Sequence, residues 1–171
     1  MRKMTEDNIR SAFAGESQAH MRYLIFAEKA EKEGLSNVAW LFRAIAYVIQ
    51  VRTTNYYNVL SMIRDTVDNL QAAINGETFE VNEMYPAYKA VAELQEERGA
   101  QRSTNWALQA EKIHTGMYQK EKQGIERKGG ISLEPVSICK ACDYTQLKVP
   151  LLIDVQYAVL PERGLGSFKT G

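Results

Sequence analysis

Cysteine, histidine and proline are scarce in this chain, which has two cysteines, two histidines and four prolines among 171 residues. An excess of either charge is also missing, because 21 basic residues balance 21 acidic ones. Without a basic surplus, nothing in the composition suggests a nucleic acid or an anionic membrane as a partner. The 45% hydrophobic and 25% charged residues exclude a disordered or collagen-like chain.

Long hydrophobic runs are absent as well. No apolar stretch approaches the roughly 18 residues that a membrane-spanning helix needs. The first ten residues, MRKMTEDNIR, contain no apolar segment typical of a signal peptide. We therefore expect a cytoplasmic protein without a membrane partner. Its length suits one well-buried domain and a small appendage.

What the chain does have is helical periodicity over its first 130 residues. Apolar residues recur at three- and four-residue steps, which predicts long helices. A short turn at Gly34 favours an antiparallel pair of helices, and the longer connection after the second helix fits a ferritin-like bundle. Thr5 is a plausible N-cap of the first helix, and Pro86 should kink the third. The expected helices cover residues 5–33, 36–64, 66–74 (a crossover segment), 78–99 and 100–126.

The predicted fold class is therefore all-α, a ferritin-like four-helix bundle with one crossover connection and a small C-terminal tail. We expect the bundle in residues 1–130 and the tail in residues 131–171, because the tail holds both cysteines and three of the four prolines. Within the tail, residues 148–155 and 156–160 have the composition of short strands or extended segments.

Carboxylates and a histidine recur at metal-ligand spacing on these helices. Glu111 and His114 form an ExxH pair, Glu80 and Glu83 form an ExxE pair, and Glu16 lies on the first helix. Residues three apart share one helix face, so each pair can bind one ion, and this donor set suits iron, manganese or zinc. A lone ExxH is usually a solvated helix face, and the companion carboxylates strengthen the metal interpretation.

The chain resembles the rubrerythrin family in four sequence words. These words are AFAGESQAHMRYLIFAEKAEKEG, LFRAIAY, GETFEVNEMYP and ALQAEKIH. The resemblance implies a ferritin-like diiron protein that reduces hydrogen peroxide, often as a dimer. It implies metal roles for Glu16, Glu80, Glu83, Glu111 and His114, with Glu111 bridging, His114 terminal and Glu83 exchanging with a histidine. It also makes Tyr23 a candidate hydrogen-bond donor to the metal ligands, with Tyr85 and Tyr118 as similar candidates; core packing is an equally good account of each. His20 is expected to be structural.

The second helix departs from the family pattern. Ile49 stands where the family has a bridging glutamate, and Arg52 stands where it has the exchanging histidine. Isoleucine cannot bind a metal, and arginine stays protonated and only donates. We expect Arg52 to pair with Glu16 or Glu83, and one ion to be held by Glu80, Glu111 and His114. A metal-free site, with Arg52 and protonated carboxylates in place of the metals, is the alternative.

The tail carries half of a second metal motif. Cys139 and Cys142 resemble the first CxxC knuckle of a rubredoxin domain, and the second knuckle is absent. Two thiolates cannot complete a four-sulfur iron site, so a rubredoxin-type iron is not expected within one chain. Three interpretations stay open, namely a relic knuckle with free thiols, a reversible disulfide, and a four-cysteine site built by two chains.

Three functional hypotheses follow. The first is a divergent rubrerythrin-like protein that binds one ion, iron or another divalent metal, with weakened or altered peroxide or oxygen chemistry. The second is a non-catalytic relative with a structural or binding role, for instance as partner of an intact rubrerythrin. The third is a surviving diiron peroxidase or oxidase. If the protein is an enzyme, we expect an oxidoreductase of the rubrerythrin type. A homodimer is expected, and the long connection is compatible with domain swapping.

Overall fold

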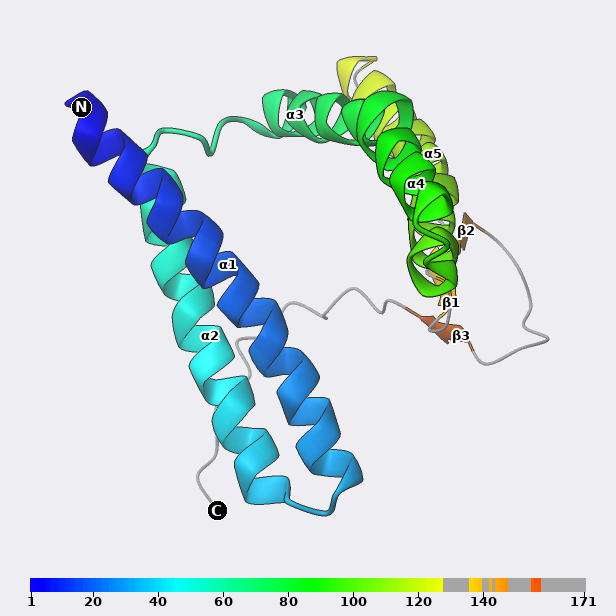
Figure 1. Ribbon diagram of the computed structural model, residues 1–171. Helices are drawn as coiled ribbons and strands as arrows, with labels where there is room; N and C mark the ends of the chain where they lie inside the picture. The colour runs from blue at the N-terminus through cyan, green and yellow to red at the C-terminus, as the bar shows by residue number, and fades with distance from the viewer. Residues whose placement is uncertain (128–135, 140–141, 143, 148–154, 158–171) are drawn as a thin grey trace. The chain divides into compact units, whose positions relative to one another are not determined.

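The computed structural model describes residues 1–127, 136–139, 142, 144–147 and 155–157 (Figure 1). The chain forms two compact units, Met1–Arg64 and Asp65–Gly171.

The first unit is an antiparallel pair of helices, α1 (Lys3–Lys32) and α2 (Ser36–Val59) (Figure 1). The predicted stop at Gly34 is confirmed, because this residue has a positive φ of 77° that favours glycine. The Leu35 N–H donates to the Ala30 carbonyl at 2.9 Å and closes the turn. Alanines fill much of the contact between the helices, where Ala39 and Ala46 are fully buried and allow close approach.

Both helices differ from the prediction at one end. α1 begins at Lys3 after an Arg2 cap without a side-chain hydrogen bond, so Thr5 is not its N-cap. α2 ends at Val59 and not near Arg64, because Ser61 adopts a positive φ of 54° that a helix cannot continue.

The second unit pairs one interrupted helical rod with one regular helix. The rod consists of α3 (Thr66–Phe79), a π-helical turn η1 (Glu80–Met84) and α4 (Tyr85–Leu94), and it packs on α5 (Arg98–Glu126). The side chain of Asp65 caps α3 by accepting from the Asp68 N–H at 2.8 Å. The helix α3 therefore begins directly after residues 60–65, which connect it to α2.

The prediction of a short crossover segment that ends at Asn75-Gly76 is wrong. Gly76 lies inside α3, and the rod continues from Thr66 to Leu94. A helical glycine costs only about 1 kcal/mol relative to alanine, which packing along α5 offsets. The π-helical turn η1 lies just before Pro86; there the Tyr85 N–H donates to the Glu80 carbonyl, and Pro86 lies in the first turn of α4. The kink expected at Pro86 stays a prediction.

A small antiparallel sheet follows α5. Its strands are β1 (Val136–Cys139), β2 (Thr145–Leu147) and β3 (Val155–Tyr157), in the order β2-β1-β3. Ile138 pairs with Thr145, and Cys139 pairs with Val155. β3 spans the junction of the two segments expected to be extended, whose other residues lie outside the described part. Neither β1 nor β2 was predicted. β2 contacts α5, so the sheet belongs to the second unit.

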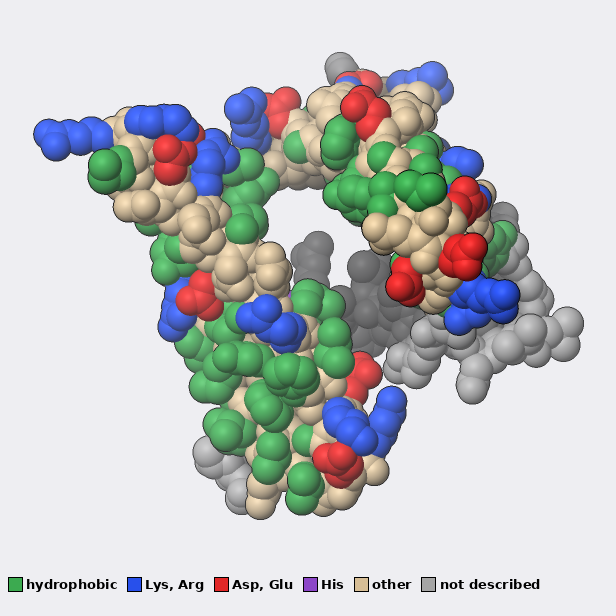
Figure 2. Space-filling view, in the orientation of Figure 1, with side chains coloured by type: hydrophobic (Ala, Val, Ile, Leu, Met, Phe, Trp, Pro, Cys, Tyr) green, Lys and Arg blue, Asp and Glu red, His purple; other side chains and the backbone are tan. Residues whose placement is uncertain are grey.

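The all-α class with four long helical rods is as predicted, and the rods form two antiparallel pairs. None of the described helices is long and apolar enough to cross a membrane. Apolar side chains gather along the surface of the α1–α2 pair (Figure 2). Among the described residues no large side chain is completely buried, and the core consists mostly of alanines with Ile49 and Ile74. Each unit therefore presents apolar surface that a bundle would cover.

Candidate metal centre

Glu77, Glu111 and His114 form the candidate metal site of the described residues. Glu77 comes from α3, and Glu111 and His114 lie one turn apart on α5. One potential ligand atom from each lies within 4.8 Å of the others. His114 Nδ1 is 2.9 Å from Glu111 Oε2 and 3.9 Å from Glu77 Oε2. Two carboxylates and one imidazole are thus directed at a common point.

The cluster is mostly shielded from solvent. The side chains of Glu77 and Glu111 are each 17% exposed, and that of His114 is 29% exposed. Glu77 Oε2 is buried without any hydrogen-bond partner. A buried carboxylate oxygen without a partner is costly, and a bound cation would satisfy it. The donor set therefore fits a divalent metal ion.

Several carboxylates lie close together in and beside the cluster, and the pKa values of Glu77 and Glu80 are raised. Burial, together with the charges of Glu111 and Glu80, raises the pKa of Glu77 to about 7, although His114 acts in the opposite direction. Burial and Glu111 also raise the pKa of Glu80. The pKa of the Tyr118 hydroxyl is raised by burial and by Glu77 and Glu111. The three shifts share two causes, burial first and then the negative charge of neighbouring carboxylates, and a bound cation would offset both.

The structure brings together two of the predicted ligands and adds one that was missed. Glu111 and His114 meet as their spacing predicted, and Glu80 lies close enough to Glu111 for their charges to interact. Glu77 completes the cluster, and Glu83, on η1, is not part of it. The available signal was the spacing, because Glu77 precedes Glu80 by three residues and forms an ExxE pair as good as Glu80 and Glu83.

The first unit holds the fifth expected ligand, Glu16, in an ion pair. Arg52 Nη1 donates to Glu16 Oε1 at 2.5 Å, which is one of the two pairings expected for this arginine. The hydrogen bond with Glu16 raises the pKa of Arg52 above its ordinary value. Ile49, one turn earlier on α2, is 4% exposed and contributes to the core. The two substituted positions thus supply packing and a cation in place of ligands.

The remaining histidine and the tyrosines differ in their surroundings. His20 Nδ1 is 2.9 Å from the Ala46 carbonyl oxygen, which ties α1 to α2 and supports the structural role expected for this residue. Tyr23 packs against Phe26 and Phe42, and the Tyr85 ring contacts Tyr88. Burial and the charges of Glu77 and Glu111 act on the Tyr118 hydroxyl. Roles of Tyr23 and Tyr85 as hydrogen-bond donors to the metal ligands stay predictions.

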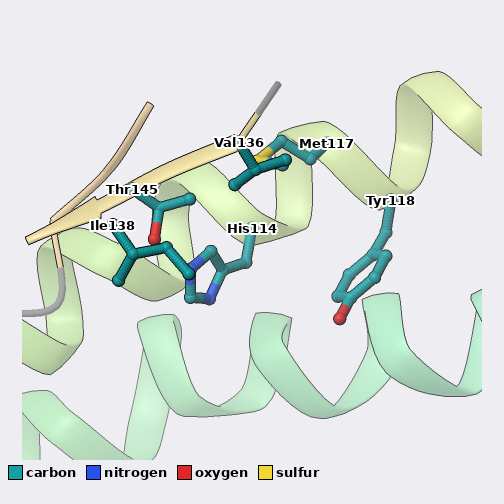
Figure 3. Close-up of a pocket in the computed structure, with 6 residues that line it drawn as sticks. All are labelled: His114, Met117, Tyr118, Val136, Ile138 and Thr145. Atoms are coloured by element: carbon teal, nitrogen blue, oxygen red, sulfur yellow. The ribbon is translucent and has the colours of Figure 1, made fainter. Parts of the chain in front are cut away.

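A pocket of about 180 Å³ lies between α5 and the small sheet, beside the His114 ring (Figure 3). His114 Nε2 is 2.9 Å from the Thr145 hydroxyl oxygen of β2. The imidazole is therefore engaged at both nitrogens, by Glu111 on one side and by Thr145 on the other. The pocket is lined by His114, Met117, Tyr118, Val136, Ile138 and Thr145.

The cysteine pair lies in and after β1. No disulfide joins Cys139 and Cys142, and both are partly exposed. The Cys139 N–H donates to the Tyr144 carbonyl at 3.0 Å. Strand β3 covers part of the segment where a second knuckle would fall, and the rest of that segment lies outside the described residues. The three interpretations of the cysteine pair therefore stay predictions.

Long antiparallel helices that present partly buried glutamates and a histidine to one site are typical of one class of protein, the helical carboxylate–histidine metalloproteins. The rubrerythrin family profile matches residues 7–122 of this chain. The chain is 42% identical to rubrerythrin-2 of Clostridium acetobutylicum over 158 residues, which cover 84% of this chain and 86% of that protein. The chain belongs to the rubrerythrin family.

Two further relatives share smaller parts of their sequence with this chain. The rubrerythrin of Porphyromonas gingivalis is 36% identical over 102 residues, which cover 52% of this chain and 51% of that protein. Nigerythrin of Nitratidesulfovibrio vulgaris is 26% identical over 154 residues, which cover 82% of this chain and 75% of that protein. The solved mixed-valence structure of nigerythrin aligns with a TM-score of 0.45 at 26% identity, covering 83% of this chain and 76% of that chain.

Proposed function

We propose that this rubrerythrin-family protein binds one divalent metal ion, iron or a similar metal, through Glu77, Glu111 and His114. The observation that carries the proposal is the buried Glu77 Oε2, which has no hydrogen-bond partner and lies 3.9 Å from the His114 nitrogen that also faces Glu111. This set replaces the predicted combination of Glu80, Glu111 and His114. Glu80 contributes charge beside the ion.

The residues around the ion have distinct tasks. His114 offers Nδ1, the ring nitrogen that faces both carboxylates. Glu77 and Glu111 supply negative charge in a partly desolvated place, where it attracts a cation more strongly than in water. Tyr118 keeps its hydroxyl protonated, because burial and the charges of Glu77 and Glu111 raise its pKa. A bound iron would supply a redox-active centre for peroxide or oxygen.

The sequence of α2 supports one ion in preference to two. Ile49 offers no donor atom, and Arg52 places a permanent positive charge where a histidine ligand is expected from the family resemblance. Glu16 is already satisfied by Arg52 at 2.5 Å. We therefore infer a redox activity that is weaker than, or different from, that of a diiron peroxidase. We also infer that electrons do not arrive through a four-thiolate iron within one chain, which has only two cysteines.

The test is metal content per chain after purification under reducing, iron-replete conditions, combined with zinc titration of the chelator-treated protein. We expect about one ion per chain. Glu77→Gln should weaken zinc binding at least about tenfold, because a neutral amide is a poor ligand. Glu126→Gln, at an exposed ion pair with Lys122, is the matched control and should bind like the wild type. Equal affinity of Glu77→Gln and the wild type would reject the site.

A second candidate function is a metal-free structural or binding relative, for instance a partner of an intact rubrerythrin. The Arg52–Glu16 pair favours it, because an arginine already neutralises one of the expected metal ligands. Purified protein without metal, and without zinc binding at micromolar concentrations, would support this alternative. Two irons per chain would instead support a surviving diiron enzyme.

A further inference from the structure

We propose that Thr145 is a positioning residue that directs His114 Nδ1 toward the metal by holding Nε2 from the opposite side of the ring. The proposal rests on the metal site proposed above and extends it to the C-terminal segment. It gives the small sheet a task that does not depend on iron bound by the cysteines.

The contact is built from buried, regular structure. Thr145 is 4% exposed and lies in β2, where it pairs with Ile138 of β1. Its hydroxyl oxygen is 2.9 Å from His114 Nε2, and the two side chains point toward each other (Figure 3). The other ring nitrogen, Nδ1, is 2.9 Å from Glu111 Oε2. The ring is thus held between the metal cluster and the sheet.

A hydroxyl suits this position because it both donates and accepts. Without metal, the Nδ1–H of the neutral imidazole can donate to Glu111, and the Thr145 hydroxyl can donate to Nε2. A metal ion requires the lone pair of Nδ1, so the ring proton must then be on Nε2. The Nε2–H donates to Thr145 Oγ1 after the hydroxyl has rotated. Thr145 therefore satisfies Nε2 in both tautomers and leaves Nδ1 available for the ion.

Removing the hydroxyl tests this role. Thr145→Val keeps the shape of the side chain but leaves a buried Nε2–H without a partner in the metal-bound state. Such outer contacts typically contribute 10- to 100-fold in metal affinity, so we expect the zinc Kd to rise by about that factor. Thr145→Ser, which keeps the hydroxyl, should remain within about threefold of the wild type. Thr104→Val is the matched control, because its hydroxyl on α5 bonds only to helix carbonyls.

A second measurement does not depend on affinity. The chain has two histidines, so imidazole ¹⁵N spectra of histidine-labelled protein contain signals from His20 and His114 alone. In zinc-loaded wild-type protein, His114 should show a protonated Nε2 and a metal-bound Nδ1. In Thr145→Val the His114 signals should shift in both the metal-free and the zinc-loaded protein. His20, which lies beside Ala46 in the first unit, should be unchanged and serves as the internal reference.

The outcomes separate this proposal from the metal site itself. Wild-type protein that binds no zinc would reject both. Zinc binding that is equal in the wild type and Thr145→Val, with unchanged His114 signals, would reject the positioning role and leave the site intact. If the valine variant does not fold, Thr145→Ala carries the same expectation, and recovery of affinity by Thr145→Ser alone would still support it.

Discussion

Glu77 combines burial, negative neighbours and an oxygen without a hydrogen-bond partner in one side chain. Its pKa of about 7, against an ordinary value of 4.5, reflects the energy needed to keep this group charged in the folded protein. The buried Glu77 oxygen without a hydrogen-bond partner destabilises the metal-free protein and favours the binding of a cation. A group of this kind is typical of functional sites.

The raised pKa of Glu77 predicts how stability depends on pH in the absence of metal. Between about pH 4.5 and 7 the folded protein retains a proton that the unfolded chain has lost, so the free energy of unfolding should fall as the pH rises through this range. The contribution of this group is at most about 3 kcal/mol. Glu77→Gln should remove that part of the slope, as measured by urea denaturation of chelator-treated protein. Parallel slopes of the variant and the wild type would contradict the assignment.

Ile49 and Arg52 are the reason why one metal ion per chain is expected, since neither side chain can bind a metal. The preceding word LFRAIAY resembles the family and both residues lie within α2, so we infer that the substitutions act on the donor set and not on the helix. Ile49 packs in the core at 4% exposure, and Arg52 is anchored by Glu16. Both side chains are therefore integrated into the α1–α2 pair.

Restoring the family residues should restore the second ion. The double variant Ile49→Glu/Arg52→His adds a carboxylate and an imidazole to α2 and removes the competing cation. We expect its iron content to rise from about one to about two per chain, as measured by elemental analysis. Gln50→Glu, which adds a carboxylate at an exposed position of the same helix, should leave the content unchanged. A double variant that folds and still binds one ion would count against the alignment of α2 with the family.

At the scale of elements, η1 separates the part of the rod that carries Glu77 from the part that follows Pro86. A π-helical turn holds one residue more than an α-helical turn, so it changes the phase between the two segments. Both α3 and α4 pack on α5, and the extra residue lets each present its own apolar face to the same neighbour.

Inserting one alanine after Asn82 should disturb that phase adjustment. One residue beyond those that η1 accommodates rotates α4 by about 100° relative to α3, so the two could no longer pack on α5 together. We expect the free energy of unfolding to fall by more than about 2 kcal/mol, the range typical of disrupted cores. Asn82→Ala changes the exposed residue beside the insertion without lengthening the chain and should stay within about 0.5 kcal/mol of the wild type. Chemical denaturation compares the three proteins, and an insertion variant as stable as Asn82→Ala would refute the role of η1.

At the scale of the whole molecule, the apolar surface of α2 exceeds what its contact with α1 covers. One stripe holds Leu41, Ile45 and Val48, and a second holds Trp40, Tyr47 and Val51, all at least 41% exposed in the described unit. A four-helix bundle covers one further face of each helix, so we infer that the second stripe is covered by a second copy of the chain. This inference agrees with the dimer expected from the family resemblance.

A charge in the second stripe should weaken the dimer. Val51→Glu places a carboxylate in the expected interface, and we predict at least a tenfold weaker dimerisation, equivalent to about 1.4 kcal/mol. Gln50→Glu adds the same charge at the neighbouring exposed position and should leave the dimer intact. Light scattering coupled to gel filtration over a concentration series measures both. A wild-type protein that is monomeric, or a Val51→Glu dimer as tight as the wild type, would refute this surface.

Much of the architecture was predictable from local signals. The periodicity of α1, α2 and α5 gave their existence, and Gly34 marked the turn because a positive φ favours glycine there. The signal failed at Asn75-Gly76, where two residues that usually end a helix lie inside α3. Local propensity amounts to about 1 kcal/mol at such a position, and packing against α5, which the sequence does not display, is larger.

The sequence by itself determined the chemistry of the site and the loss of donors in α2. Glu111 and His114 are one turn apart on any helix, and Ile49 and Arg52 cannot bind a metal in any fold. Only the tertiary structure decided which glutamate joins them and what holds the histidine from behind. Glu77 meets Glu111 because α3 packs on α5, and Thr145 meets His114 because β2 returns to α5 from 31 residues away. Contacts between distant segments depend on packing and helix phase, which no local pattern encodes.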